Sequence, residues 1–138
     1  MLKREPGWNP FVESIGLHIQ SAEGGTCRGE LEIVPTLHNP FQSVHGGAVF
    51  SMADCCMAEA VFSLLGEGQI CSTIENKVNF IHGAGGGRLR CEAQVQHRGR
   101  STAVATATVS DGARVIARLQ GTFAILDRAT HATPPGRP

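Results

Sequence analysis

The chain has 138 residues, enough for one domain with a substantial core but hardly for two. Its 12 basic and 12 acidic side chains leave no net charge, so no long-range field attracts nucleic acid or an anionic membrane. The first residues contain no secretory apolar stretch, and the one long apolar segment carries two acidic side chains, which argues against a membrane span. We therefore expect a cytoplasmic protein that binds neither nucleic acid nor membranes.

The five cysteines are odd in number and lack the spacing of a metal site. Most lie in apolar or alternating segments, which favours reduced, buried thiols. The histidines show no metal-binding pattern, and no glycine-rich nucleotide motif follows a strand. We expect no metal and no cofactor.

The chain begins with an irregular or short helical lead-in, followed by two short strands. Apolar and polar residues alternate over residues 17–21 and again over 28–33, and Glu23-Gly24-Gly25 lies between the two segments. A period of two on either side of a tight Gly-Gly connection predicts an antiparallel pair.

A long helix follows. Residues 48–65 are rich in Ala, Met and Leu and end at Gly66, which favours helix over strand. Asp54 falls on an apolar face of that helix, where an ionisable group is costly unless something pairs with it or uses it. Its helical neighbours are Phe50, Met57, Ala58, Val61 and Leu65. Asp54 is therefore the first candidate for a functional residue.

Beyond the helix, apolar and polar residues alternate again with a period of two, in four segments. The first is predicted to carry Ile74, Val78 and Phe80 on one face and Thr73, Glu75, Lys77 and Asn79 on the other. A glycine-rich loop over residues 82–87 leads to an alternating strand at 88–97, and another follows from residue 103. Asp111-Gly112 is a hairpin signal before the last strand, which ends near residue 125.

Short turns between these strands imply antiparallel pairing. The predicted fold is α+β: one curved antiparallel sheet wrapped around one long central helix, in a single domain over residues 1–126. Residues 127–138 are expected to form a mobile tail. Because one sheet face cannot cover a helix that is apolar on nearly every side, we expect a second copy of the chain to cover the rest.

Five segments together resemble the hotdog-fold acyl-CoA thioesterases of the phenylacetate-degradation (PaaI-like) type, and the resemblance covers roughly Trp8 to Leu126. It implies the hotdog fold, hydrolysis of an acyl-CoA thioester without a cofactor, and a homodimer that pairs into a homotetramer. The sequence departs from the family at His82-Gly83, where an Arg-Pro pair is usual. The matching segments are Asn39 to Gly47, the helix with Asp54, Thr73 to Ile81, Arg98 to Thr102, and Ala113 to Ala117.

Thioester hydrolysis needs a polarised carbonyl, an activated water and a holder for coenzyme A. The helix start at Gly46-Gly47 offers unpaired N–H groups and the positive end of the helix dipole, which suit a developing oxyanion. The resemblance implies that the amide of Gly47 or Gly46 polarises the carbonyl, with help from Asn39.

For Asp54 the resemblance implies a general base toward water or a direct nucleophile, often supplied across the dimer interface. The alternative is a buried carboxylate satisfied by backbone or hydroxyl groups. Thr73 matches a position that orients the water, although a structural threonine is nearly as good an interpretation. His45 either orients substrate or water, or caps the turn.

Arg98 and Arg100 flank a glycine between two strands, where they either meet the phosphates of coenzyme A or form a solvated basic turn. Phe80 and other large apolar residues are candidates for an acyl tunnel that accepts aryl or medium-chain groups. Two rival functions stay open: a non-catalytic acyl-CoA sensor, and a hotdog enoyl hydratase or dehydratase, which His45 with Asp54 does not exclude.

Overall fold

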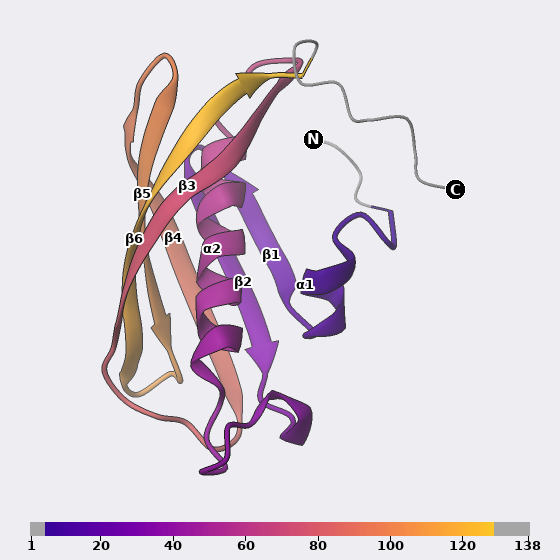
Figure 1. Cartoon of the computed structure of the whole chain (residues 1–138), viewed down its shortest axis with the longest axis vertical. Coiled ribbons are helices and arrows are strands. Elements are labelled where there is room, and N and C mark those ends of the chain that lie inside the picture. Colours follow the sequence, from indigo (N-terminus) through magenta and orange to yellow (C-terminus); the bar gives the residue numbers. More distant parts are fainter. Residues whose placement is uncertain (1–4, 129–138) are drawn as a thin grey trace.

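The computed structural model describes residues 5–128. Its elements are α1 (Pro10–Ser14), β1 (His18–Glu23), β2 (Thr26–Glu32), a short 3-10 helix (Pro35–Leu37), α2 (Gly46–Phe62), β3 (Gln69–Phe80), β4 (Arg88–Arg98), β5 (Thr102–Ser110) and β6 (Val115–Asp127). The six strands form one antiparallel sheet in the order β1-β2-β4-β5-β6-β3. The sheet curves around α2, as Figure 1 shows, so the predicted α+β architecture is confirmed.

The boundaries differ slightly from those predicted. Helix α2 ends at Phe62, before the glycine that was expected to close it. Strand β6 includes Asp127, and the amide of Arg128 donates to the carbonyl of Gly68, so the predicted tail does not begin at 127. The remainder of that tail, residues 129–138, lies outside the described residues. No helix within residues 5–128 is long and apolar enough to cross a membrane.

Small residues on the inner face of the sheet let α2 lie close to it. Ala103, Ala105 and Ala107 of β5 alternate inward and are at most 4% exposed. Gly29 of β2 also lies close to the helix, because a Cβ there would lie 2.7 Å from the sulfur of Cys56 in α2. At these positions, small inward side chains therefore let the sheet lie close to the helix.

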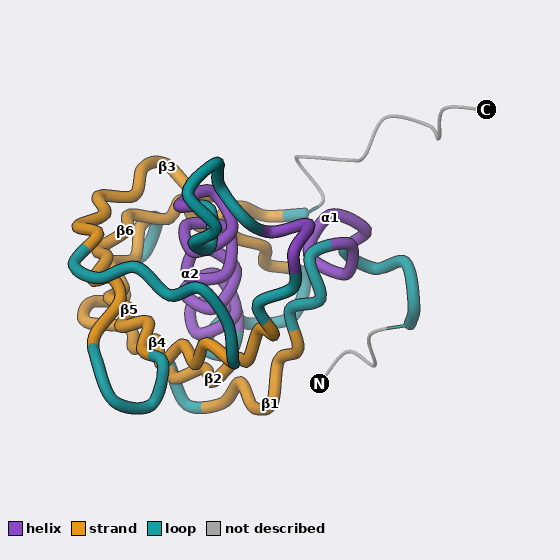
Figure 2. Tube along the Cα trace, turned by 90° about the horizontal axis from the view of Figure 1, so that it is seen from below, coloured by secondary structure: helices purple, strands orange, loops and turns teal. Residues whose placement is uncertain are grey.

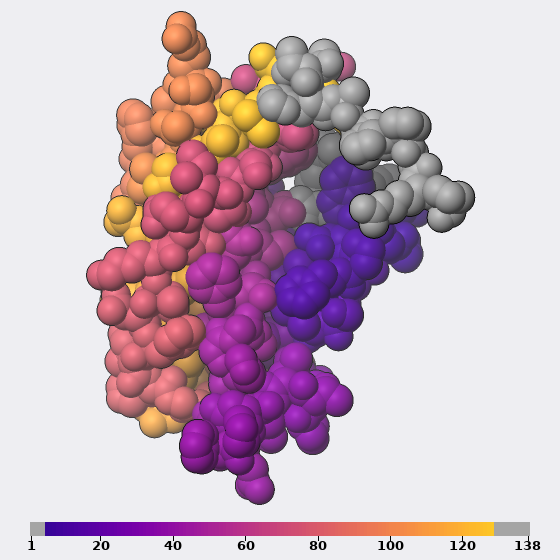
Figure 3. Space-filling view, viewed as in Figure 1, coloured from indigo at the N-terminus to yellow at the C-terminus, as the bar shows by residue number. Residues whose placement is uncertain are grey.

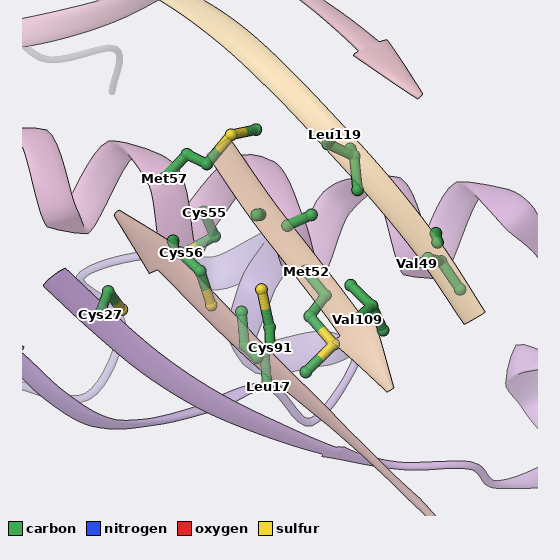
Figure 4. Close-up of a cluster of buried hydrophobic side chains, with 14 of the residues drawn as sticks. Leu17, Cys27, Val49, Met52, Cys55, Cys56, Met57, Cys91, Val109 and Leu119 are labelled. Carbon is green, nitrogen blue, oxygen red and sulfur yellow. The ribbon is translucent and has the colours of Figure 1, made fainter. Parts of the chain in front are cut away.

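Three of the five thiols meet between helix and sheet: Cys27 from β2, Cys56 from α2 and Cys91 from β4 (Figure 4). A hydrogen bond with Cys27 lowers the pKa of the Cys56 thiol, but the hydrogen bond with Cys91 and burial raise it well above its usual value. All five cysteines are free of disulfides, four of them buried and Cys71 half-buried. These thiols fill the core, as predicted.

One stripe of α2 is not fully covered by the sheet. Phe50, Asp54 and Ala58, each four residues apart, are only half-buried. Figure 2 shows the strands around α2, with β6 and α1 on opposite sides of it, and Figure 3 shows part of α2 at the surface between β3 and α1. This agrees with the prediction that one sheet face leaves part of the helix uncovered.

Strand β3 contains a bulge at Ile74. Thr73 pairs with Phe123, whereas Glu75 pairs with the neighbouring Thr122, so Ile74 is an extra residue without a partner across the ladder. Side chains alternate along a regular strand, and the extra residue shifts that alternation by one. Thr73 therefore faces α2, and the prediction that placed it on the face away from Val78 was wrong.

The close approach at Gly29 makes a testable prediction about stability. Gly29→Ala should lower the free energy of unfolding by about 1–3 kcal/mol, because the added methyl overpacks the core against Cys56. Urea denaturation measures the change. Gly86→Ala is the matched control, because a Cβ there has open space around it. Equal stability of the two variants would contradict this close packing of helix on sheet.

Candidate active site

The Asp54 carboxylate is held by two side chains of β3. Its Oδ1 accepts hydrogen bonds from the Thr73 hydroxyl at 2.8 Å and from Nδ2 of Asn76 at 2.6 Å. Its Oδ2 accepts none from any residue in the range 5–128. The structure thus brings the predicted Asp54 and Thr73 together, and adds Asn76.

This arrangement explains how a carboxylate is tolerated on an apolar helix. Hydrogen bonds to a charged group contribute about 1.5–3 kcal/mol each, enough to offset much of the desolvation of a half-buried carboxylate. Thr73 and Asn76 are three positions apart and would lie on opposite faces of a regular strand. The bulge between them places both on the side of Asp54.

Asn76 was not predicted from the sequence, although a signal was present. It has the same strand parity as Val78 and Phe80, the predicted inward residues. A polar amide among apolar residues of one strand face is unfavourable unless it is hydrogen-bonded, as is the carboxylate of Asp54 on its helix face. Such an amide predicts a buried polar partner nearby.

A thiol lies beside the carboxylate. Cys71 of β3 is half-buried, and its sulfur donates to the carbonyl oxygen of Ala58 at 3.6 Å. Burial raises the pKa of the Cys71 thiol to about 11, and the negative charge of Asp54 adds to the rise. The thiol is therefore protonated at neutral pH and is a poor nucleophile there.

The first turn of α2 carries the predicted oxyanion donors. His45 caps the helix, and its Nδ1 accepts a hydrogen bond from the Gly47 amide at 2.8 Å. The Gly46 amide donates to no group within the described residues. The ring of Phe80 covers this glycine, since a Cβ on Gly46 would lie 3.0 Å from the ring's Cζ. His45 therefore acts as the cap, and the Gly46 N–H is the more available donor.

Asn39 fixes the loop before α2. Its Oδ1 accepts from the amides of Phe41 at 2.9 Å and Ser43 at 3.2 Å. Residues 82–87, where the sequence departs from the family, pack against this loop: the Val44 amide donates to the carbonyl of the buried Ala84 at 2.8 Å. The side-chain oxygen of Asn39 is thus engaged, and its amide nitrogen makes no hydrogen bond inside the described range.

Arg98 and Arg100 lie far from these groups within one chain. The Arg98 guanidinium donates to Oε1 of Gln69 at 3.1 Å, just after α2 ends. Figure 1 shows the β4–β5 turn at the end of α2 opposite to Gly46. Helix α2 has 17 residues, which span about 25 Å. Arg100 is exposed and makes no hydrogen bond or ion pair with residues 5–128.

The described part of the chain contains no candidate metal-binding site. No group of three or more His, Cys, Asp or Glu side chains there is arranged to hold a metal ion. The candidate site therefore consists of a carboxylate with two donors, and a helix start with one available amide.

The chain is similar to known proteins over most of its length. A family model described as the thioesterase superfamily matches residues 41–117. Rv1847, a proposed esterase of Mycobacterium tuberculosis, is 30% identical over 115 residues, which are 80% of this chain and 82% of the relative. The acyl-coenzyme A thioesterase PaaI of Escherichia coli is 31% identical over 94 residues, 67% of this chain and 65% of PaaI. The conserved protein PA5202 of Pseudomonas aeruginosa superposes with a TM-score of 0.83 at 37% identity, over 85% of this chain and 94% of that one.

Fold and relatives together define a hotdog-fold thioester hydrolase, an enzyme that acts on acyl-CoA thioesters. The chain belongs to the thioesterase superfamily and is of the PaaI-like type. The family resemblance inferred from the sequence is confirmed.

The environment of Cys71 gives a prediction that does not depend on activity. At pH 8.5 its alkylation by iodoacetamide should be about a hundredfold slower than that of an ordinary cysteine, because so little thiolate forms. Asp54→Asn should speed the reaction, since removing the negative charge lowers the pKa of the thiol. Mass spectrometry of the peptide that contains Cys71 measures both rates.

Glu75→Gln is the control for this experiment, because Glu75 bonds Thr122 rather than the Asp54 group. An alkylation rate that is equal in wild type and Asp54→Asn would contradict the proximity of the two side chains.

Proposed function

We propose that this enzyme hydrolyses an aryl- or medium-chain acyl-CoA, with Asp54 as the general base toward water. One observation carries the proposal: both donors bind Oδ1 of Asp54, which leaves Oδ2 to accept a proton. Thr73 orients the carboxylate, and with it the water that the carboxylate holds. The reaction uses no metal and no cofactor, since coenzyme A is part of the substrate.

In the proposed reaction, water attacks the thioester carbonyl carbon and passes a proton to Asp54. The electron pair of the C=O bond moves to the oxygen, which becomes an oxyanion held by N–H groups at the start of α2. Gly46 supplies the available amide, and Asn39 supplies its side-chain nitrogen. The Gly47 amide joins them when it leaves the His45 ring. The oxyanion then collapses, the C–S bond breaks, and coenzyme A leaves as a thiolate that takes up a proton.

Direct attack by Asp54 on the carbonyl is the remaining alternative. It would form a mixed anhydride and expel coenzyme A before water enters. A single turnover in oxygen-18 water that leaves label in the Asp54 carboxylate would establish the anhydride, because water that attacks the thioester directly labels only the released acid.

The spacing of Gly46 and Asp54 supports the proposal that each site is shared by two chains. Asp54 lies eight residues after Gly46, which places the two roughly 12 Å apart along the helix axis. Reacting groups must approach to about 3–3.5 Å, and a carbonyl and its water meet such groups more readily when the two come from different chains. We propose that the Gly46 of one chain works with the Asp54 of a second copy.

The surface beside Asp54 suits such a dimer. Among residues 5–128, strand β3 is an edge strand that pairs only with β6, and it contacts Asp54 in the half-buried stripe of α2. Ile74 and Phe80 of this strand and Ile81 just after it are 58%, 55% and 46% exposed, which leaves apolar side chains for a partner to cover. In the proposed dimer, a two-fold axis lies beside β3 and perpendicular to it. The α2 helices of the two chains then run in opposite directions.

The same two-fold axis brings the partner's β4–β5 turn to the end where this chain's α2 begins. Arg100, and Arg98 if it leaves Gln69, would there meet the phosphates of coenzyme A bound at the start of α2. The pairing of such dimers into a homotetramer and a cytoplasmic location stay predictions of the sequence.

The role of Asp54 makes the first functional prediction. Asp54→Asn should lower kcat by about 10² or more, because the variant cannot take the proton from water. Its thermal stability should stay equal or rise, since a half-buried charge is removed. Thiol release from phenylacetyl-, hydroxybenzoyl-, hexanoyl- and palmitoyl-CoA measures the effect.

Undiminished turnover in Asp54→Asn would refute the assigned role. Wild-type protein that binds these esters without releasing thiol would favour the sensor, and hydration of an enoyl-CoA would favour the hydratase.

The oxyanion donor is tested by Gly46→Pro. Proline is well tolerated at the first position of a helix, and His45 before it already has an extended ψ of 134°. The substitution removes one N–H, so kcat should fall by about 10²–10³. Gly46→Ala is the matched control: it adds the same Cβ beside Phe80 but keeps the N–H. Equal losses in both variants would show that the Cβ, and not the missing donor, is responsible.

A further inference from the structure

We infer that Asn76 is a positioning residue, which fixes the orientation of the Asp54 carboxylate and lowers the stability of the fold in doing so. The inference rests on the proposed role of Asp54 as the base. Its starting point is the hydrogen bond from Nδ2 of Asn76 to Oδ1 of Asp54, at 2.6 Å the shorter of the two that hold the carboxylate.

The other end of the Asn76 amide is unsatisfied. Its side-chain oxygen is buried and accepts no hydrogen bond within the described residues. A buried, unpaired carbonyl is unfavourable for folding, whereas an apolar side chain of similar size would have no such penalty at this position. Packing alone therefore does not explain an asparagine here.

Space for that amide comes from Gly121. This glycine of β6 lies directly across the ladder from Asn76, and a Cβ on it would overlap the Asn76 side-chain oxygen. Glycine inside a strand is itself unfavourable, because it loses more backbone freedom on folding and packs no side chain.

The bulge at Ile74 is the third departure from a regular sheet, because it leaves one residue of the ladder unpaired. Bulge, glycine and unpaired carbonyl all oppose stability. The bulge turns Thr73 to the side that Asn76 already faces, and the glycine leaves room for the Asn76 amide. Features that oppose stability at one point are typical of a functional constraint rather than of packing.

The amide contributes what the Thr73 hydroxyl cannot. A hydroxyl rotates about its C–O bond and follows the carboxylate as it pivots, so one such donor leaves the pivot free. The planar amide of Asn76 donates from a second, fixed direction to the same oxygen. Together the two donors fix the orientation of the carboxylate plane, so that Oδ2 points in one direction, toward the proposed water. Loss of Asn76 should therefore affect turnover rather than substrate binding.

Asn76→Leu tests this inference in the full-length protein, with the acyl-CoA that the wild type hydrolyses fastest. We expect kcat to fall by about tenfold or more, since small misplacements of a catalytic group have effects of that size. KM should stay within about twofold, and the midpoint of thermal unfolding should stay equal or rise. Asn79→Leu, on the outward side of the same strand, is the control and should leave kcat and KM unchanged.

A kcat that stays within about twofold of wild type would overturn the inference, as would a kcat that falls only together with the unfolding midpoint. If Asn76→Leu does not fold, Asn76→Ala decides, because it removes the donor without adding bulk or charge: lost turnover in the folded variant supports the inference and retained turnover overturns it. Asp54→Asn is measured alongside. If that variant stays active, the proposed function fails; if it is inactive while Asn76→Leu stays active, only the inference fails.

Discussion

The hydrogen bonds from β3 to the Asp54 carboxylate constrain most of what surrounds them. A carboxylate on an apolar helix needs donors, and both donors come from a strand that must bulge to supply them. The bulge in turn sets which side chains of β3 face α2, and Gly121 makes room for the second donor. The sheet, the helix and the candidate base are therefore parts of one arrangement, in which the carboxylate is held at the expense of regular strand packing.

A second constraint comes from the length of the helix. Gly46 and Asp54 occupy the same α2, roughly 12 Å apart, so within one chain the proposed oxyanion donor lies apart from the proposed base. The half-buried stripe of α2 and the unpaired edge of β3 are the surfaces left for a second chain. Membership of the thioesterase superfamily establishes the kind of reaction. The proposed division of the site between two chains explains how this sequence performs it.

Much of the fold followed from periodicity. The alternation in β4, β5 and β6 and the Asp111-Gly112 hairpin needed only local rules, and Asp54 stood out because its charge contradicted its helix face. Thr73 was placed on the wrong side because an extra residue in β3 depends on pairing with β6, which no local pattern encodes. Asn76 shares the strand parity of Val78 and Phe80, so an inward amide there could have been predicted from the sequence. The sequence could not show that Gly47 donates to His45, which is a matter of side-chain geometry.

Restoration of activity by mixing two inactive variants tests the shared site most directly. Asp54→Asn and Gly46→Pro chains, unfolded together and refolded at equal concentration, should form mixed dimers in which one site carries both changes and the other carries neither. Activity should then return to about a quarter of the wild-type value, because half of the dimers are mixed and each has one intact site. If the mixture stays as inactive as its two components, each site lies within a single chain and the proposed division between two chains is wrong.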